Sequence, residues 1–391
     1  MKRMDLCKAN LAIKPGFRVS RLALPASVLH CGSFFFQSIL FCAFVMLEVT
    51  YAADSVRLEK IAEIKLKAAP ITVDWNMDGS LLAVAGWQSS LAIWDANTSK
   101  IILNESFGRV GFGVVKFSPD GQWLAAGRDF TDELSSLWLF DTSSWKHHDV
   151  SSARRLRSTD SLCFTHDGSR VVAATSAFRK SPYLINFRDA TETLRLQPKR
   201  ENKLVKNVTC HPFQSIVAVG WTAAMLEIYD TKTGSLIDSI QAFDPDWWWI
   251  EEVEFSQDGR FLFTGSNSGM TVEKLNKRTG KMEKKDRGEP IKMWDSSTLK
   301  LLRMFGDQKD GEVFLESSVR SLSHSARDGL LLAGFDGGKI RAWDVETGEE
   351  RLRRSGWRSA VTAKFSHDGS RLAVADQGSR SVTIFKILDT R

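Results

Sequence analysis

The sequence predicts an all-β protein in which seven four-stranded antiparallel sheets form the blades of a closed ring. Three observations lead to this fold. A segment such as Val114–Ala126, VVKFSPDGQWLAA, recurs seven times between residues 56 and 391. Each copy contains two alternating strands, usually joined at an Asp-Gly pair, and a third alternating strand follows and usually ends in an aromatic residue and Asp. Fixed-period similarity of this kind is typical of repeat architectures.

The two strands of each copy are short and have the period of two that a half-buried strand requires. Glycine in the Asp-Gly pair supplies the positive φ that closes a tight hairpin. The copies begin at Val73, Val114, Leu162, Val208, Val253, Leu322 and Ala363, of which those at Val208 and Leu322 are the weakest.

The third strand of each copy ends in a recognisable pair of residues. These pairs are Trp94-Asp95, Phe140-Asp141, Arg188-Asp189, Tyr229-Asp230, Trp294-Asp295 and Trp343-Asp344, with a degenerate seventh strand at Val382–Phe385. A turn such as Thr231–Gly234 then leads to a fourth strand. A four-stranded sheet of this size cannot bury both faces alone, so the copies are expected to stack face to face and to close into a ring. The prediction is a seven-bladed β-propeller.

The motif F-S-P-D-G at Phe117–Gly121, followed by W-D and T-G elements, resembles the WD-repeat β-propeller family over roughly residues 56–391. The resemblance implies that Leu58–Leu66 supplies the outer strand of the last blade, beside Ser381–Leu388. It also implies a non-catalytic scaffold for protein–protein interaction. The family's Gly-His before the first strand and its Asp before the third do not recur, and Gly337 stands at one expected Asp position. We therefore expect a divergent member, bacterial and exported.

Residues 1–53 have the organisation of an export signal. A basic segment precedes the apolar run Phe34–Leu47, and small residues follow, so that cleavage is expected after Ala52. An uncleaved membrane anchor is the alternative, although 14 residues at about 1.5 Å each are short for a bilayer core of about 30 Å. A start codon assigned too early would also explain the long leader. The expected location is periplasmic or secreted, or membrane-anchored if the segment is retained.

The net charge of +6 and the isoelectric point near 9.0 suggest a basic protein at first sight. Six basic and two acidic residues lie in the leader, however, so the remaining chain is nearly neutral. Only Cys163 and Cys210 lie beyond the leader. Two independent buried thiols are the favoured interpretation of this pair, and a single disulfide is the alternative. The sequence contains no paired cysteine or histidine spacing typical of zinc sites.

No catalytic motif is recognisable in the chain. His166, His211, His324 and His367 occupy equivalent turns of different copies, so we interpret them as turn residues, and the sequence predicts no catalytic, cofactor-binding or metal-binding residue. The alternative is an enzyme or small-molecule binder that uses the central channel, of the quinone-dependent dehydrogenase or lactonase type.

The loops that connect blades share one face with the turns between second and third strands, and we call this the blade-connecting face. An insertion near residues 270–290 is expected to form an extra hairpin, unless Thr271–Leu275 is itself the third strand of its copy. The predicted partner-binding residues are Trp247, Trp248, Trp249, Trp357, Arg154, Arg155, Arg353 and Arg354. They predict a protein partner, with an acidic surface or a polyanion as its chemistry. Nucleic acid is not expected, and a membrane only if the apolar segment is uncleaved.

Overall fold

Residues 51–391 form one compact unit in the computed structural model. The structure describes residues 55–128, 136–150, 158–174, 182–188, 191–199, 204–243, 249–267, 272–275, 282–285, 288–309, 311–315 and 317–388. The expected leader, residues 1–53, lies outside this part of the chain. No helix in the described residues is long and apolar enough to cross a membrane.

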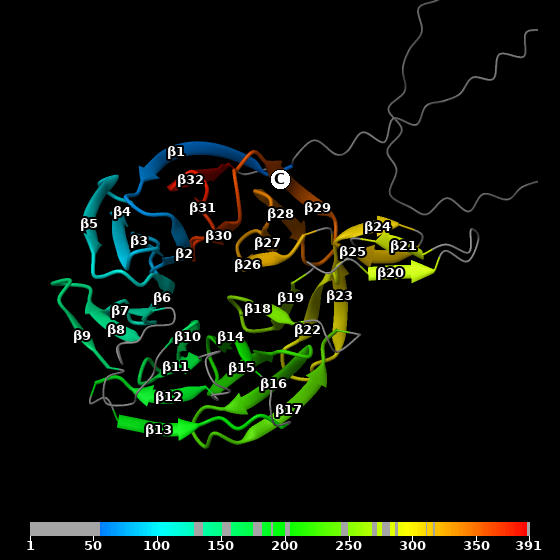
Figure 1. Cartoon of the computed structure of the whole chain (residues 1–391), viewed down its shortest axis with the longest axis horizontal. Coiled ribbons are helices and arrows are strands. Elements are labelled where there is room, and N and C mark those ends of the chain that lie inside the picture. The colour runs from blue at the N-terminus through cyan, green and yellow to red at the C-terminus, as the bar shows by residue number, and fades with distance from the viewer. Residues whose placement is uncertain are drawn as a thin grey trace, which may run out of the picture. The chain divides into compact units, whose positions relative to one another are not determined.

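Seven four-stranded antiparallel sheets surround a central channel (Figure 1). Blade 1 contains β2 (Pro70–Trp75), β3 (Leu81–Gly86), β4 (Ser90–Asp95) and β5 (Lys100–Ser106). Blade 2 contains β6 (Phe112–Phe117), β7 (Trp123–Arg128), β8 (Leu137–Asp141) and β9 (His147–Asp149). Blade 3 contains β10 (Ser161–Phe164), β11 (Val171–Ala174), β12 (Tyr183–Asn186) and β13 (Thr191–Arg195). Blade 4 contains β14 (Val205–Cys210), β15 (Ile216–Trp221), β16 (Met225–Asp230) and β17 (Leu236–Gln241).

The remaining three blades follow the same plan. Blade 5 contains β18 (Ile250–Phe255), β19 (Phe261–Ser266), β22 (Ile291–Asp295) and β23 (Leu301–Phe305). Blade 6 contains β26 (Val319–Ser325), β27 (Leu330–Phe335), β28 (Lys339–Asp344) and β29 (Glu350–Ser355). Blade 7 contains β30 (Val361–Phe365), β31 (Arg371–Asp376), β32 (Ser381–Leu388) and β1 (Arg57–Lys65). The predicted fold class is confirmed.

Ring closure depends on the pairing of the first and last strands. Strand β1 lies antiparallel to β32, from the pair Arg57 and Leu388 to the pair Lys65 and Ser381. The N-terminal segment therefore supplies the outer strand of blade 7, as the resemblance implied. Because this blade combines both ends of the described chain, no blade is left with an open face at the start of the ring.

Each blade is stabilised by packing against its neighbours. The third-strand tryptophans are core residues: Trp94 meets Trp75 edge to face at 6.2 Å, and the indole N–H of Trp294 donates to Thr264 Oγ1 at 3.0 Å. The aspartates that follow them form turns, since Asp295 Oδ1 accepts the backbone N–H groups of the next turn. The hydroxyl groups of Ser297 and Thr298 also donate to Asp295 Oδ1, and these side-chain hydrogen bonds are the largest cause of the lowered pKa of Asp295.

Blade 5 carries the expected insertion. Strand β19 pairs with β22, so the segment ending at Asp295 is the third strand. Strands β20 (Val272–Leu275) and β21 (Met282–Lys285) form a separate hairpin, as favoured from the sequence. A second hairpin, β24 (Asp307–Lys309) with β25 (Glu312–Phe314), follows blade 5 and was not expected.

Candidate functional sites: the central channel and the blade-connecting face

The innermost strands of all seven blades line a channel with a cavity of about 410 Å³. At one register position of these strands the side chain varies from blade to blade, and lysine occurs twice. In order, the seven residues are Asp74, Lys116, Cys163, Thr209, Glu254, Ser323 and Lys364. We call this set the junction layer, because several of its members join one blade to the next.

Two ion pairs lie in the junction layer. Lys116 Nζ is 3.3 Å from Asp74 Oδ1, and Lys364 Nζ is 3.2 Å from Glu254 Oε2. Burial disfavours the charged form of Lys116, but the carboxylates of Asp74, Glu254 and Glu252 outweigh it and raise its pKa. Lys116 is thus held as a cation inside the channel.

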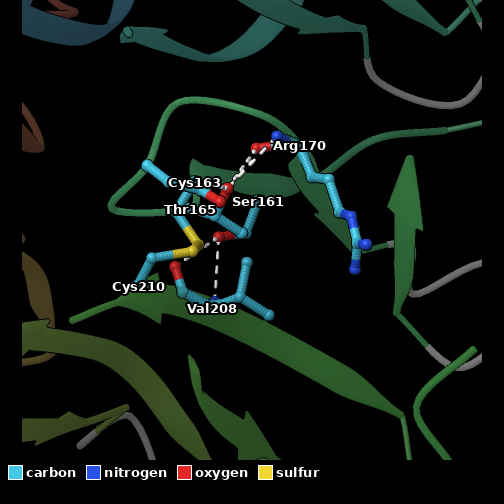
Figure 2. Close-up of a disulfide and its surroundings, with 7 residues drawn as sticks. Ser161, Cys163, Thr165, Arg170, Val208 and Cys210 are labelled. Carbon is cyan, nitrogen blue, oxygen red and sulfur yellow. Dashed lines mark hydrogen bonds between the residues drawn. A yellow bond between two sulfur atoms is a disulfide. The ribbon is translucent and has the colours of Figure 1, made fainter. Parts of the chain in front are cut away.

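Neighbouring blades are joined in this layer in two ways. Asp74 Oδ2 accepts the backbone N–H of Phe117 at 2.9 Å, and Ser323 Oγ accepts that of Phe365 at 3.0 Å. Between blades 3 and 4 the same position holds a disulfide from Cys163 to Cys210, with a sulfur–sulfur distance of 2.11 Å (Figure 2). Beside it, Ser161 Oγ accepts the backbone N–H of Val208.

The favoured interpretation of Cys163 and Cys210 as independent thiols is therefore wrong, and the disulfide alternative holds. The two cysteines occupy different register positions in their copies, since Cys210 corresponds to Phe117 and Phe365. Innermost strands of adjacent blades converge at the channel, so a side chain of one blade reaches the following register position of the next. Their Cα atoms lie 5.7 Å apart, which is ordinary for a disulfide.

Glu252 lies one layer nearer to the blade-connecting face than Glu254 on strand β18. Its Oε2 accepts a hydrogen bond from Asn207 Nδ2 at 3.4 Å. Burial raises the pKa of Glu252 to about 8; Lys364 opposes this shift, whereas Glu254 and Glu251 reinforce it. At the rim, Arg320 pairs with Glu251 at 3.3 Å and with Asp336 at 2.7 Å.

Histidines lie at the opposite end of the channel. His211 Nδ1 accepts the backbone N–H of Phe213, and its Nε2 lies 3.0 Å from the carbonyl of Gly259. His324 Nδ1 accepts the backbone N–H of Gln257, and burial lowers the pKa of His324 to about 4. The contact with Phe213 supports the interpretation of His211 as a turn residue, whereas His324 lies within β26 and contacts the neighbouring blade. In the described part of the chain, no group of three or more His, Cys, Asp or Glu side chains is placed to hold a metal ion.

The structure describes part of the predicted partner surface. The indole of Trp249 is 40% exposed at the start of β18, and Lys206 Nζ lies 4.2 Å from its ring centroid. Trp357 is half-buried against the core shared by blades 6 and 7. The other predicted residues of the loops, Trp247, Trp248, Arg154 and Arg155, lie outside the described residues. They remain predictions.

From the sequence, Arg353 and Arg354 were expected in a blade-connecting loop. The structure places both within β29, the outer strand of blade 6. The sequence interpretation placed the fourth strand too early, because its alternation is obscured by three arginines. Arg353 donates to Glu350 and to Asp307 of the β24–β25 hairpin, both at 2.8 Å. Arg341, largely buried, contacts the same two carboxylates and strengthens this link between hairpin and blade.

Sequence reasoning missed Trp87, whose side chain is 52% exposed in the turn between β3 and β4. Its backbone N–H donates to the carbonyl of Ala69, in the segment that leads into blade 1. The available signal was its position directly after Gly86, at the end of a buried second strand. Met77 and Phe213 are also exposed, but they lie in first-to-second-strand turns on the opposite face.

Comparison with known proteins agrees with this architecture, although no family model matches the chain. The WD repeat-containing protein 55 homolog of Drosophila erecta is 23% identical over 60% of this chain and 40% of its own length. The WD repeat-containing protein SL1-17 of Schistosoma mansoni is 27% identical over 42% of this chain and 44% of its own length. The chain thus spans less than half the length of these relatives.

Among solved structures, the β-propeller domain of Cps50 (Swd1) from Myceliophteria thermophila superposes with a TM-score of 0.66. It covers 85% of this chain and all of that domain at 15% identity, which bears on the fold. The closed ring, the recurrent turns and the buried third-strand aromatics define a seven-bladed β-propeller. In its repeat sequence the chain is similar to these WD repeat-containing proteins, and in its fold to this solved propeller domain.

Proposed function

We propose that the chain is a non-catalytic scaffold that binds a protein partner through its blade-connecting face, outside the cytoplasm. The observation that carries this proposal is the exposure of two tryptophans, Trp87 and Trp249, on that face. Tryptophan is enriched at binding hot spots because it buries a large rigid surface. The similarity to WD repeat-containing proteins supports the interpretation as a scaffold.

Both tryptophans are held by backbone contacts. The N–H of Trp87 binds the carbonyl of Ala69, and that of Trp249 binds Asn267 Oδ1 at 3.1 Å. These bonds order the backbone at both positions in the free protein, which limits the backbone entropy lost when a partner covers the rings. The face is thus organised for binding before the partner arrives.

The charges around these rings favour a partner with an acidic surface. Arg109 and Arg358 are exposed in blade-connecting segments, and Lys206 lies over the ring of Trp249. Opposite charges steer association and contribute to specificity. Residues Arg154 and Arg155, predicted for the same face, would add to this field.

The disulfide supports residence in an oxidising compartment, because cytosolic thiols are normally kept reduced. Together with the signal-like leader, it supports export with cleavage after Ala52. Mass spectrometry of the protein from its native host should find an N-terminus at Ala53. A chain that begins at Met1 would contradict cleavage and favour membrane anchoring.

The partner surface can be tested by comparing alanine variants on the two faces of the ring. The double variant Trp87→Ala/Trp249→Ala should recover at least about tenfold less of its cross-linked partner than the wild type, since each buried anchor contributes about 1–2 kcal/mol. Met77→Ala/Phe213→Ala removes similarly exposed apolar groups from the opposite face and is the matched control. Equal recovery by all three proteins, or loss only in the control, would overturn the proposed face.

A further inference from the structure

The channel contains one carboxyl group that the protein's own cations leave unmatched. Asp74 pairs with Lys116, Glu254 with Lys364, and Glu251 with Arg320. Within the described ranges no lysine or arginine forms an ion pair with Glu252, whose hydrogen-bond partner is the amide of Asn207.

The space beside Glu252 is open. Four residues in the same layer carry small hydroxyl side chains, namely Thr72, Ser161, Ser321 and Thr362. The cavity of about 410 Å³ contains Glu252, Asn207 and these residues in its lining. Sites for small molecules usually occupy about 300–1,000 Å³ and use a few placed polar groups in this way.

We propose that the channel binds the cationic head of a ligand, a primary ammonium or a guanidinium, through the Glu252 carboxylate and the side-chain carbonyl of Asn207. The Asn207 amide N–H group donates to Glu252, and its carbonyl oxygen is the acceptor that a second ligand N–H requires. A free amine and a lysine or arginine side chain of a partner share this chemistry. The site is separate from the tryptophans of the blade-connecting face, so the two proposals can fail independently.

Binding of a cation at this site should release a proton from Glu252, and this release can be measured. With a pKa of about 8, most Glu252 side chains are protonated at pH 7. The charged groups that act on Glu252 are Glu254 and Glu251 on the same strand, Lys116 on β6, Arg320 on β26 and Lys364 on β30. A bound cation favours the carboxylate, so the proton leaves to solvent as the ion pair forms. Affinity should therefore rise up to about tenfold per pH unit below pH 8 and level off above it.

Titration calorimetry of the wild-type protein tests this directly. The probes are agmatine and 1,5-diaminopentane as free amines, and N-acetyl-lysine amide and N-acetyl-arginine amide as side-chain mimics. Binding at pH 7 in two buffers with different heats of ionisation should show release of nearly one proton per cation. Saturation by the free amines alone indicates a small ligand, and saturation by the amino acid amides alone indicates a partner side chain.

Glu252→Gln should weaken the effective probe at least about tenfold, the size of a charged hydrogen bond, and should abolish its pH dependence. Glu105→Gln makes the same chemical change at an exposed carboxylate on the outer strand β5, outside the channel lining, and should alter affinity less than about threefold. No saturable binding of any probe, unchanged binding by Glu252→Gln, or binding without proton release would overturn the proposal. The proton release measured with the wild-type protein tests the proposal even if a variant folds poorly.

Discussion

Blades 3 and 4 are joined covalently at the channel wall, whereas blades 6 and 7 are joined at the same register position by one neutral hydrogen bond. The first junction is the Cys163–Cys210 disulfide and the second is the bond from the Phe365 N–H to Ser323 Oγ. The junction of blades 1 and 2 uses a carboxylate, Asp74. The comparison teaches that ring geometry brings this pair of positions together in each case, while the side chains decide how strongly the blades are held.

The largest effect is expected at the covalent junction. Cys163→Ala/Cys210→Ala should lower the free energy of unfolding by about 4 kcal/mol, because the disulfide constrains a separation of 47 residues in the unfolded chain. Urea denaturation with and without reductant measures this difference. As a matched comparison, Cys163→Ser/Cys210→Phe rebuilds the junction of blades 6 and 7 and should recover about 1 kcal/mol. Identical stability of the oxidised and reduced wild type would contradict the assigned role.

The ionic junction should rank second. Asp74→Ala leaves Lys116 without its carboxylate and removes the acceptor of the Phe117 N–H, which should cost about 3 kcal/mol of unfolding free energy. Asp74→Ala/Lys116→Met removes the stranded cation as well, so denaturant melts should show it closer to the wild type. If the double variant is less stable than Asp74→Ala, the unpaired charge of Lys116 is not the cause of the lost stability.

Substitution of Glu252 should raise the free energy of unfolding, whereas the substitutions at the junctions lower it. Its folded-state pKa of about 8 exceeds the ordinary value of 4.5, so the native state binds the extra proton between these pH values and loses stability as pH rises through them. Glu252→Gln should therefore be about as stable as the wild type at pH 5 and about 2 kcal/mol more stable at pH 8, allowing for channel water. Chemical denaturation at the two pH values measures this. Parallel pH profiles would show that Glu252 titrates normally.

The neutral junction should have the smallest effect. Ser323→Ala removes the acceptor of the Phe365 N–H, and the expected loss is about 1 kcal/mol. Ser239→Ala on the outer strand β17 is the control and should change the unfolding free energy by less than about 0.5 kcal/mol. A loss at Ser323 as large as that of the disulfide would remove the distinction between the two kinds of junction.

Much of this architecture could be read from local pattern. The alternating strands, the Asp-Gly turns and the buried Trp94, Trp294 and Trp343 follow from short-range chemistry, and the closing β1–β32 pair followed from the family resemblance. The disulfide could not be predicted from the local pattern, because Cys163 and Cys210 stand at different positions of their copies. Arg353 was misplaced because a strand rich in basic residues resembles a solvated loop.

The candidate sites depended more strongly on contacts between distant residues. Trp87 could be found from its position after Gly86, but its exposure follows from the packing of the turn against blade-connecting segments. Glu252 directly precedes the V-E-F segment of an ordinary strand pattern. Its sequence neighbours do not predict its hydrogen bond with Asn207, which lies 45 residues away.

The sequence by itself determined the repeat, the number of blades and the residues that face the core, because strand period and turn chemistry act over a few residues. The tertiary structure was needed to show which channel charges form ion pairs, that the two cysteines bond, and that Glu252 forms no ion pair with a lysine or arginine among the described residues. The physical reason is convergence: the channel brings together one strand from each of seven blades, and the electrostatics of that space depend on distances that no local pattern encodes.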